Sequence, residues 1–362
     1  MNTRMLLCAA LTFAVPSLAD DASEKAAADL LHRRLAHENP EDVALLKSVK
    51  GKDIVVVAGE MDHIEQVLAA TGIPFTLIQP SQVAEFQLRS SMALMVNCPG
   101  TMPDAGVKRI ERFVRAGGLL YTTDWALRSI IEKAFPNTIA FGGSLTEAEV
   151  VPVVVDSQTD NLMSNVLLRK GSKPQWYLEG GSFPIKVLDA KRVDVLAHSD
   201  AMASKYGSAP VVVHFRWEDG EVIHVVSHFF RQLDTVGPKV AAAKEVKSFE
   251  GLTDEDRRDF AKSAPAGTSV GDVESSYAFQ RMTSNLVAGK QKRNVELNKT
   301  YDMTVNADVS IRSAPAPAAA PVAQAEAKAS RMKVLGRKDG QAHVRDEFGN
   351  EGWVSEKALT AY

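Results

Sequence analysis

One segment decides the fold: residues 53–80, with the sequence DIVVVAGEMDHIEQVLAATGIPFTLIQP. It opens on a short β-branched apolar run at 53–59, continues with helical spacing at 63–71, and ends in a second apolar run at 74–80. Two such runs joined by one helix are typical of parallel strands, because a parallel pair needs a crossover connection. The segment therefore predicts the first strand–helix–strand unit of an α/β sheet.

The same alternation continues downstream. Residues 93–98 form a third apolar run, residues 104–116 have helical spacing and end at Gly117 and Gly118, and residues 119–123 form a fourth run. Four strands separated by helices predict an α/β fold with an open, mostly parallel sheet and helices on both faces. After a helix near 127–134 we expect further strands, some of them antiparallel. These are expected at 149–156, 175–178, 193–198, 210–217 and 222–228.

The regions before and after this alternation are more polar. Residues 20–50 have helix-like spacing and are expected to form a helical lead-in. Residues 229–275 are charged and predict a surface excursion or lid, with a helix that begins after the capping residue Thr253. A helix at 273–288 is expected to pack back on the sheet, and the basic run 290–293 to end that helix in solvent.

The first 19 residues have the features of a secretory signal peptide. Arg4 gives a positive start, residues 5–15 are apolar, and small residues lead to Ala19. We expect cleavage after Ala19 and a periplasmic or secreted protein, since no later segment is long and apolar enough for a stable membrane span. Lipid anchoring at Cys8 is the alternative.

Composition excludes several function classes. The 362 residues carry a formal net charge of -3, which gives no general attraction for nucleic acid, so we expect no such partner. Only two Cys are present, too few for a disulfide framework or a Cys-rich zinc site, and removal of the signal leaves Cys98 alone. No Gly-rich strand-to-helix turn of the phosphate-binding type occurs, and we expect no cofactor.

The last 61 residues, 302–362, resemble a bacterial SH3-like (SH3b) domain, a small all-β barrel. The resemblance rests on three features in order: Val309-Ser-Ile-Arg312-Ser-Ala-Pro315, the strand and hairpin at 332–345, and Gly352-Trp353-Val354. It places the Ala/Pro-rich stretch 313–330 in a long irregular loop inside the domain. Relatives outside the cytoplasm bind cell-wall peptide or act as protein contact modules, so Trp353 is either a core residue or a ligand platform.

Residues 51–298 resemble the class I glutamine-amidotransferase-like domain, which has a flavodoxin-like fold. The run Asn97-Cys98-Pro99-Gly100 stands where that family has its oxyanion loop, and Thr123 or Asp124 stands at the elbow that carries the family's nucleophilic Cys. The segment at 225–230 keeps the family's His as His228 but lacks the following Glu. The resemblance thus implies a catalytically degenerate domain.

In such a sheet, ligands bind beyond the carboxyl ends of the strands. The candidate crevice residues are Glu60, Asn97, Cys98, Thr123, Asp124 and His228. Asp124 and His228 could form an acid–base pair, with Thr123 as a weak nucleophile or Glu60 as a second carboxylate. The interpretation we favour is structural: Asp124 caps the following helix and His228 bonds to the elbow backbone.

A metal site is not expected. His224 and His228 fall on one face of the same expected strand, and His214 lies on a neighbouring one, so a cluster of three His is conceivable. Strand geometry separates the first two by two pleats, which disfavours a shared ion.

These observations lead to one hypothesis and two alternatives. The hypothesis is an exported cell-envelope binding or scaffold protein, with a degenerate amidotransferase-like domain and an SH3-like domain that binds cell-wall peptide or a protein partner. One alternative is an envelope hydrolase or amidase that acts on cell-wall peptide through the crevice. The other is a subunit of an export or motility apparatus.

Overall fold

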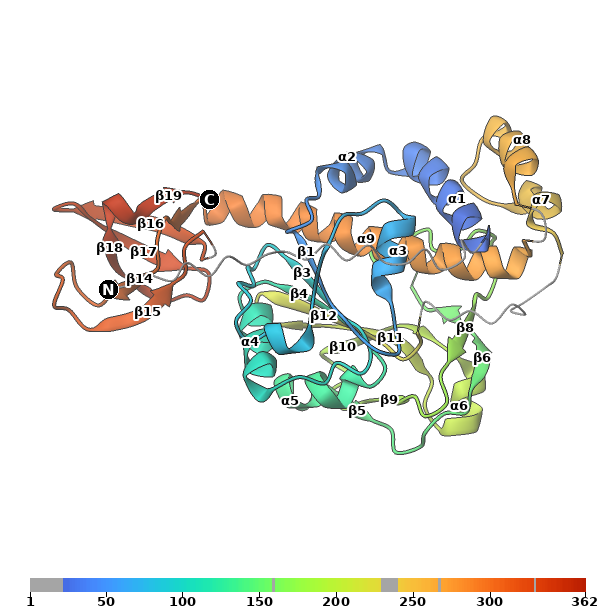
Figure 1. Ribbon diagram of the computed structural model, residues 1–362, viewed down its shortest axis with the longest axis horizontal. Helices are drawn as coiled ribbons and strands as arrows, with labels where there is room; N and C mark the ends of the chain where they lie inside the picture. The colour runs from blue at the N-terminus through green and yellow to red at the C-terminus, as the bar shows by residue number, and fades with distance from the viewer. Residues whose placement is uncertain (1–21, 158–159, 229–239, 266–267, 329) are drawn as a thin grey trace, which may run out of the picture.

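The computed structural model describes residues 22–157, 160–228, 240–265, 268–328 and 330–362. The expected signal peptide lies outside them. The chain forms a mixed α/β part with a large, mostly parallel sheet, and a separate antiparallel sheet at the C-terminus (Figure 1). Among the described residues, no helix combines the length and apolar character needed to cross a bilayer.

The large sheet has eight strands in the order β2-β1-β3-β4-β12-β11-β10-β7. The first five run parallel, and the last three pair antiparallel, as expected from the strand-rich second half. Every residue of the parallel strands β1, β3 and β4 is buried, which explains their continuous apolar character. The strands are β1 Ile54–Val57, β2 Thr76–Ile78, β3 Ala93–Val96, β4 Leu119–Thr123, β7 Val154–Val155, β10 Val193–His198, β11 Pro210–Trp217 and β12 Gly220–Val225.

Helices cover the sheet on both faces (Figure 1). One group lies with the long helix α9 (Val270–Thr300) and contains α1 Ala22–Glu38, α2 Pro40–Ser48 and α3 Ile64–Ala70. The other group contains α4 Asp104–Arg115, the π-helical turn η2 Leu127–Ile131 and α5 Glu132–Ala134. A short 3-10 turn, η1 Pro80–Gln82, follows β2. The expected helical lead-in at 20–50 is therefore occupied by α1 and α2.

Smaller elements extend the α/β part. Two strand pairs lie beside the main sheet: β5 Ile139–Phe141 with β9 Ile185–Val187, and β6 Glu149–Pro152 with β8 Gln175–Leu178. The further helices are α6 Asp200–Tyr206, α7 Ala242–Glu245, η3 Val246–Ser248 and α8 Asp254–Ser263. Thr253 caps α8 by accepting from the amide of Asp256, as the sequence predicts.

Helix α9 spans Val270–Thr300 and links the two parts of the molecule (Figure 1). The expectation that residues 290–293 end a helix in solvent is wrong. Lys290 is buried inside the helix, and its Nζ donates to the carbonyl oxygens of Ser90 and Gly117. Burial lowers the pKa of Lys290, and these two acceptors satisfy its buried amino group, so the lysine fastens α9 to the end of α4.

The C-terminal sheet has seven strands in the order β15-β14-β18-β17-β16-β13-β19, all paired antiparallel. Its elements are β13 Met303–Val305, β14 Val309–Arg312, β15 Pro321–Ala325, β16 Met332–Lys338, β17 Gln341–Asp346, β18 Glu351–Ser355, η4 Glu356–Ala358 and β19 Leu359–Ala361. The Ala/Pro-rich stretch is only partly a loop, because its second half forms β15 and pairs with β14.

Candidate functional site

Three side chains meet beyond the carboxyl ends of β3, β4 and β12: Cys98, Asp124 and His228. His228 Nε2 lies 3.1 Å from Asp124 Oδ2, and Cys98 Sγ lies 3.9 Å from the same oxygen. The ligating atoms of all three lie within 4.8 Å of one another. Their exposed fractions are only 1%, 1% and 2%. The cluster is therefore a buried group of titratable side chains.

Sheet register brings these residues together. Val96 of β3 pairs with Thr122, and Val225 of β12 pairs with Thr123, so the three strands end almost level. The backbone turns sharply at Asp124, whose φ is +42°. This left-handed conformation is uncommon outside glycine but is tolerated by Asp, and it directs the carboxylate back toward the neighbouring strand ends.

A loop distant in sequence completes the cluster. Ser182 Oγ donates to Asp124 Oδ2 at 3.0 Å, and the amide of Phe183 donates to Asp124 Oδ1 at 2.8 Å. Gly181, with φ +92°, makes the turn, and its carbonyl oxygen accepts from Trp125 Nε1. These partners are not apparent from the sequence, in which the pair Gly180-Gly181 is the one signal that a tight turn occurs there.

The structural role expected for Asp124 is therefore wrong in detail. Its side chain does not cap the following helix but accepts from the loop between β8 and β9. His228 does not bond to the elbow backbone; it lies against the Asp124 carboxylate. Both residues still hold segments together, but through a side-chain cluster.

The electrostatics of the cluster favour a protonated His228 ring beside a neutral Cys98 thiol. Burial disfavours a charged His228 ring, but the contacts with Asp124 and Cys98 and the charge of Asp62 outweigh it and raise the pKa of His228. Burial raises the pKa of the Cys98 thiol. A protonated imidazole is not a ready base, and a neutral thiol is a poor nucleophile.

The other expected crevice residues lie around this cluster. Thr123 Oγ1 accepts from the amide of Cys98 at 3.1 Å, so it positions the end of β3. Asn97 binds Glu65 through its amide group and caps α3 by accepting from Ile64 N. Glu60 contributes only its backbone amide, bonded to Cys98 O, and its side chain is exposed.

The three histidines do not converge. His224 is fully buried and contacts Thr122 Oγ1 through Nδ1, at 2.9 Å. His214 lies near Asp194, on the adjacent strand. In the C-terminal sheet, Trp353 is half-buried and stacks on His343, with ring centroids 4.9 Å apart.

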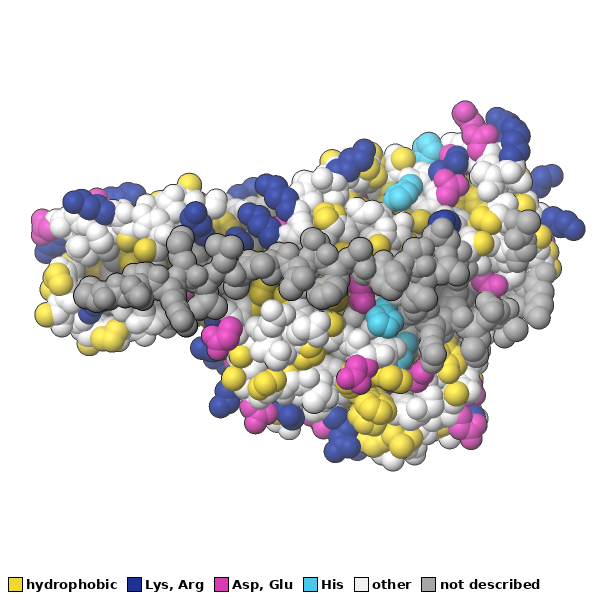
Figure 2. All heavy atoms as spheres, in the orientation of Figure 1, with side chains coloured by type: hydrophobic (Ala, Val, Ile, Leu, Met, Phe, Trp, Pro, Cys, Tyr) yellow, Lys and Arg dark blue, Asp and Glu magenta, His cyan; other side chains and the backbone are white. Residues whose placement is uncertain are grey.

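An aromatic surface lies above the elbow. The rings of Trp125 and Phe183 are stacked with centroids 5.7 Å apart, and Phe141 packs on Phe183. Trp125 and Leu145 are 39% and 57% exposed. Figure 2 shows hydrophobic side chains gathered on this edge of the α/β part, near β5 and β9. This apolar surface adjoins the cluster, because Trp125 follows Asp124 in the chain and the amide of Phe183 donates to the Asp124 carboxylate.

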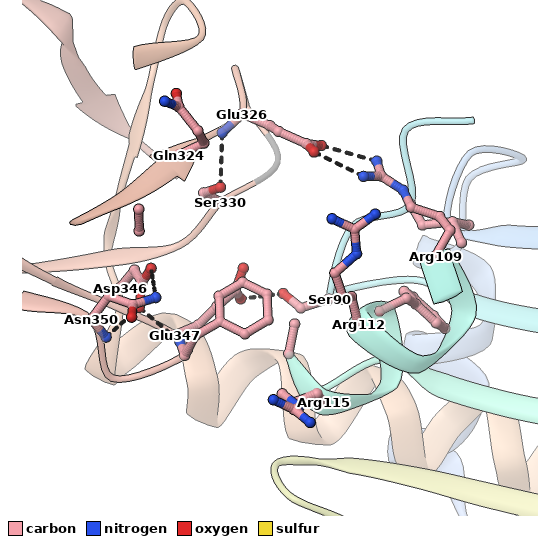
Figure 3. Close-up of a pocket in the computed structure, with 15 residues that line it drawn as sticks. Ser90, Arg109, Arg112, Arg115, Gln324, Glu326, Ser330, Asp346, Glu347 and Asn350 are labelled. Atoms are coloured by element: carbon pink, nitrogen blue, oxygen red, sulfur yellow. Dashed lines mark hydrogen bonds and ion pairs between the residues drawn. The ribbon is translucent and has the colours of Figure 1, made fainter. Parts of the chain in front are cut away.

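A second candidate site is the pocket between α4 and the C-terminal sheet, with a volume of about 430 Å³ (Figure 3). Arg109 closes one side through a bidentate ion pair with Glu326. Glu347 closes another, because its carboxylate accepts from Ser90 Oγ at 2.5 Å. Arg112 projects from α4 into the space between them. The pocket presents a cationic group between the two parts of the chain.

Comparisons with known proteins assign no family. No family model matches the chain, and no curated protein matches it. Among solved structures, a β-galactosidase from Rahnella sp. R3 is 16% identical, with a TM-score of 0.36 over 50% of this chain and 29% of that one. A cytoplasmic protein from Salmonella typhimurium is 11% identical, with a TM-score of 0.37 over 58% and 97%. A β-galactosidase from Bacillus circulans sp. alkalophilus is 12% identical, with a TM-score of 0.39 over 89% and 43%. The chain spans about a third or less of the first matched structures.

Proposed function

We propose that this chain is an exported cell-envelope binding or scaffold protein. In this proposal, a catalytically degenerate amidotransferase-like domain is followed by an SH3-like domain that binds cell-wall peptide or a protein partner. The observation that supports this proposal is that the side chain at the elbow already has hydrogen-bond partners within the chain. Asp124 stands where the resembled family has its nucleophile, and its carboxylate is buried and already engaged by Ser182 and Phe183.

The topology supports the two resemblances. The order β2-β1-β3-β4-β12 of the parallel strands is the order of a flavodoxin-like sheet. The C-terminal strands enclose a small apolar core of their own, which is consistent with an SH3-like barrel. That core includes Val305, Ile311, Met332, Ala342, Val344 and Val354.

Two surfaces suit a peptide ligand. The Trp353 ring is partly exposed and its orientation is fixed by stacking on His343, so it offers a rigid apolar platform. Arg112 lies in the pocket between α4 and the C-terminal sheet, and a guanidinium group binds carboxylates well. Wall peptides carry carboxylates, so Arg112 offers a second, separate contact for such a ligand.

The test is co-sedimentation of residues 20–362 with purified peptidoglycan sacculi. We use substitutions rather than a truncation because Arg331 and Glu347 are buried against the α/β part, and removing the C-terminal sheet would expose that face. Trp353→Ala should lower the bound fraction. Trp125→Ala is the matched control, since it removes the same partly exposed ring type from the other part of the chain.

The outcomes separate the two surfaces. Wild-type binding that falls with Trp353→Ala and persists with Trp125→Ala supports the proposal. Binding that is lost only with Trp125→Ala would assign the wall to the aromatic surface above the elbow and contradict the role of the C-terminal sheet. A wild-type chain that stays in the supernatant would contradict wall binding itself.

A further inference from the structure

We propose that Cys98, Asp124 and His228 form a binding site for one divalent transition-metal ion of the zinc type. The site goes beyond the proposed function and does not depend on it. Within the described residues, this is the one group of three or more His, Cys, Asp or Glu whose ligand atoms come close enough to share an ion.

The geometry suits a small ion. Zinc bonds to sulfur at about 2.3 Å and to nitrogen or oxygen at about 2.0–2.2 Å, so two ligands of a tetrahedral site lie about 3.3–3.8 Å apart. The observed separations are 3.1 Å between His228 Nε2 and Asp124 Oδ2, and 3.9 Å between Cys98 Sγ and that oxygen. Small side-chain rotations would place one ion between the three atoms. The donor set of thiolate, imidazole and carboxylate is one that zinc accepts.

The residues that contact His228 and Asp124 are arranged like the residues that orient the ligands in metal sites. Glu179 Oε2 lies 3.9 Å from His228 Nδ1, the ring nitrogen that faces away from the cluster. A carboxylate behind a ligating imidazole is a common arrangement in zinc sites, because it fixes the ring orientation. Asp124 is held in the same way by the hydroxyl of Ser182 and the amide of Phe183.

The contacts that the structure describes give the two ring nitrogens of His228 no well-aligned hydrogen bond. His228 is only 2% exposed, and its ring nitrogens lie near the carboxylates of Asp124 and Glu179 without a well-aligned hydrogen bond to any group that the structure describes. Buried polar atoms normally have such partners. Asp62, which is fully buried, adds negative charge that acts on the ring. A metal ion bound at Nε2 would give this nitrogen a partner and would take the place of the ring proton beside the Asp124 carboxylate.

The three histidines on neighbouring strands gave no reason to expect a metal ion. The proposed ligands instead come from three different residue types at three strand ends. Binding would replace the thiol proton of Cys98 and any proton on the ring, and both would be released to solvent. An ion there would join β3, β4 and β12 at their carboxyl ends.

The test uses residues 20–362 with a reductant that does not bind metal. The chain is dialysed against excess Zn²⁺, gel-filtered, and analysed for bound metal. We expect about one zinc ion per chain for the wild type and less than about a tenth of that for Cys98→Ala and His228→Gln. His198→Gln is the matched control, because His198 also lies against carboxylates, those of Asp156 and Asp200, but at the surface.

A second measurement covers the case in which His228→Gln does not fold. Cobalt bound to the wild type should give a thiolate-to-cobalt charge-transfer band that is missing in folded Cys98→Ala. Zinc should also raise the melting temperature of the wild type and leave that of Cys98→Ala unchanged. A folded, reduced wild type that retains no zinc would overturn the proposal, and so would equal retention by Cys98→Ala.

Discussion

Replacing Asp124 by Asn should destabilise the protein strongly without removing atoms from its core. Asn has nearly the same shape and tolerates the φ of +42°, so the elbow itself should remain unstrained. The amide can still accept from Phe183 N, but it no longer provides a negative charge beside His228, 3.1 Å away. Removing one partner of a buried ion pair costs about 3–5 kcal/mol, because the other charge stays buried or must be neutralised.

The assay is urea unfolding at neutral pH in the presence of a chelator, so that metal does not contribute. Asp156→Asn is the control, because Asp156 also contacts a histidine, His198, but both side chains are substantially exposed. That change should cost less than about 1 kcal/mol. If Asp124→Asn lowers the free energy of unfolding no more than Asp156→Asn does, the cluster does not hold the strand ends together.

Three further predictions can be checked by the same unfolding assay. Burial raises the pKa of Glu347 from 4.5 to about 7, so the folded state favours the protonated acid. The free energy of unfolding should therefore fall by up to about 3 kcal/mol as the pH rises from 4.5 to about 7, and Glu347→Gln should remove this dependence on pH. In Gly59→Ala the new Cβ would lie 2.3 Å from Cys98 O, which should lower the free energy of unfolding by about 3 kcal/mol. In Gly289→Ala, in α9, the new Cβ meets no atom within 4 Å, and the change should raise the free energy of unfolding by about 1 kcal/mol. Equal effects of the two changes would contradict the close approach of Gly59 to Cys98. Arg109→Ala should cost less than about 1 kcal/mol, because Glu326 is 40% exposed, and a larger loss would show that this ion pair holds the two parts together.

The strand–helix alternation of the α/β part was predictable because local patterns encode it. The run at 54–57 is β-branched and wholly buried, as expected for an inner parallel strand. The predicted strand at 119–123 agrees with β4 in both bounds. The carboxyl-edge position of Asp124 and His228 followed from these strands, since parallel strands end at the same edge.

The partners of the site were not predictable, because they depend on contacts between distant segments. Ser182 and Phe183 come from a loop about 58 residues beyond Asp124, and no local pattern links them to it. Lys290 has the sequence context of an exposed basic run. Its burial follows from two carbonyl oxygens supplied by residues 90 and 117, which only the folded chain brings near.

The most direct test of a non-catalytic wall-binding protein records binding and turnover together. Residues 20–362 are incubated with purified sacculi, and the pelleted protein and the soluble wall fragments released are both quantified. We expect the protein to pellet with the sacculi while release stays at the level of the protein-free blank. Release above the blank that is lost in folded Asp124→Asn or His228→Ala would contradict it and identify a hydrolase.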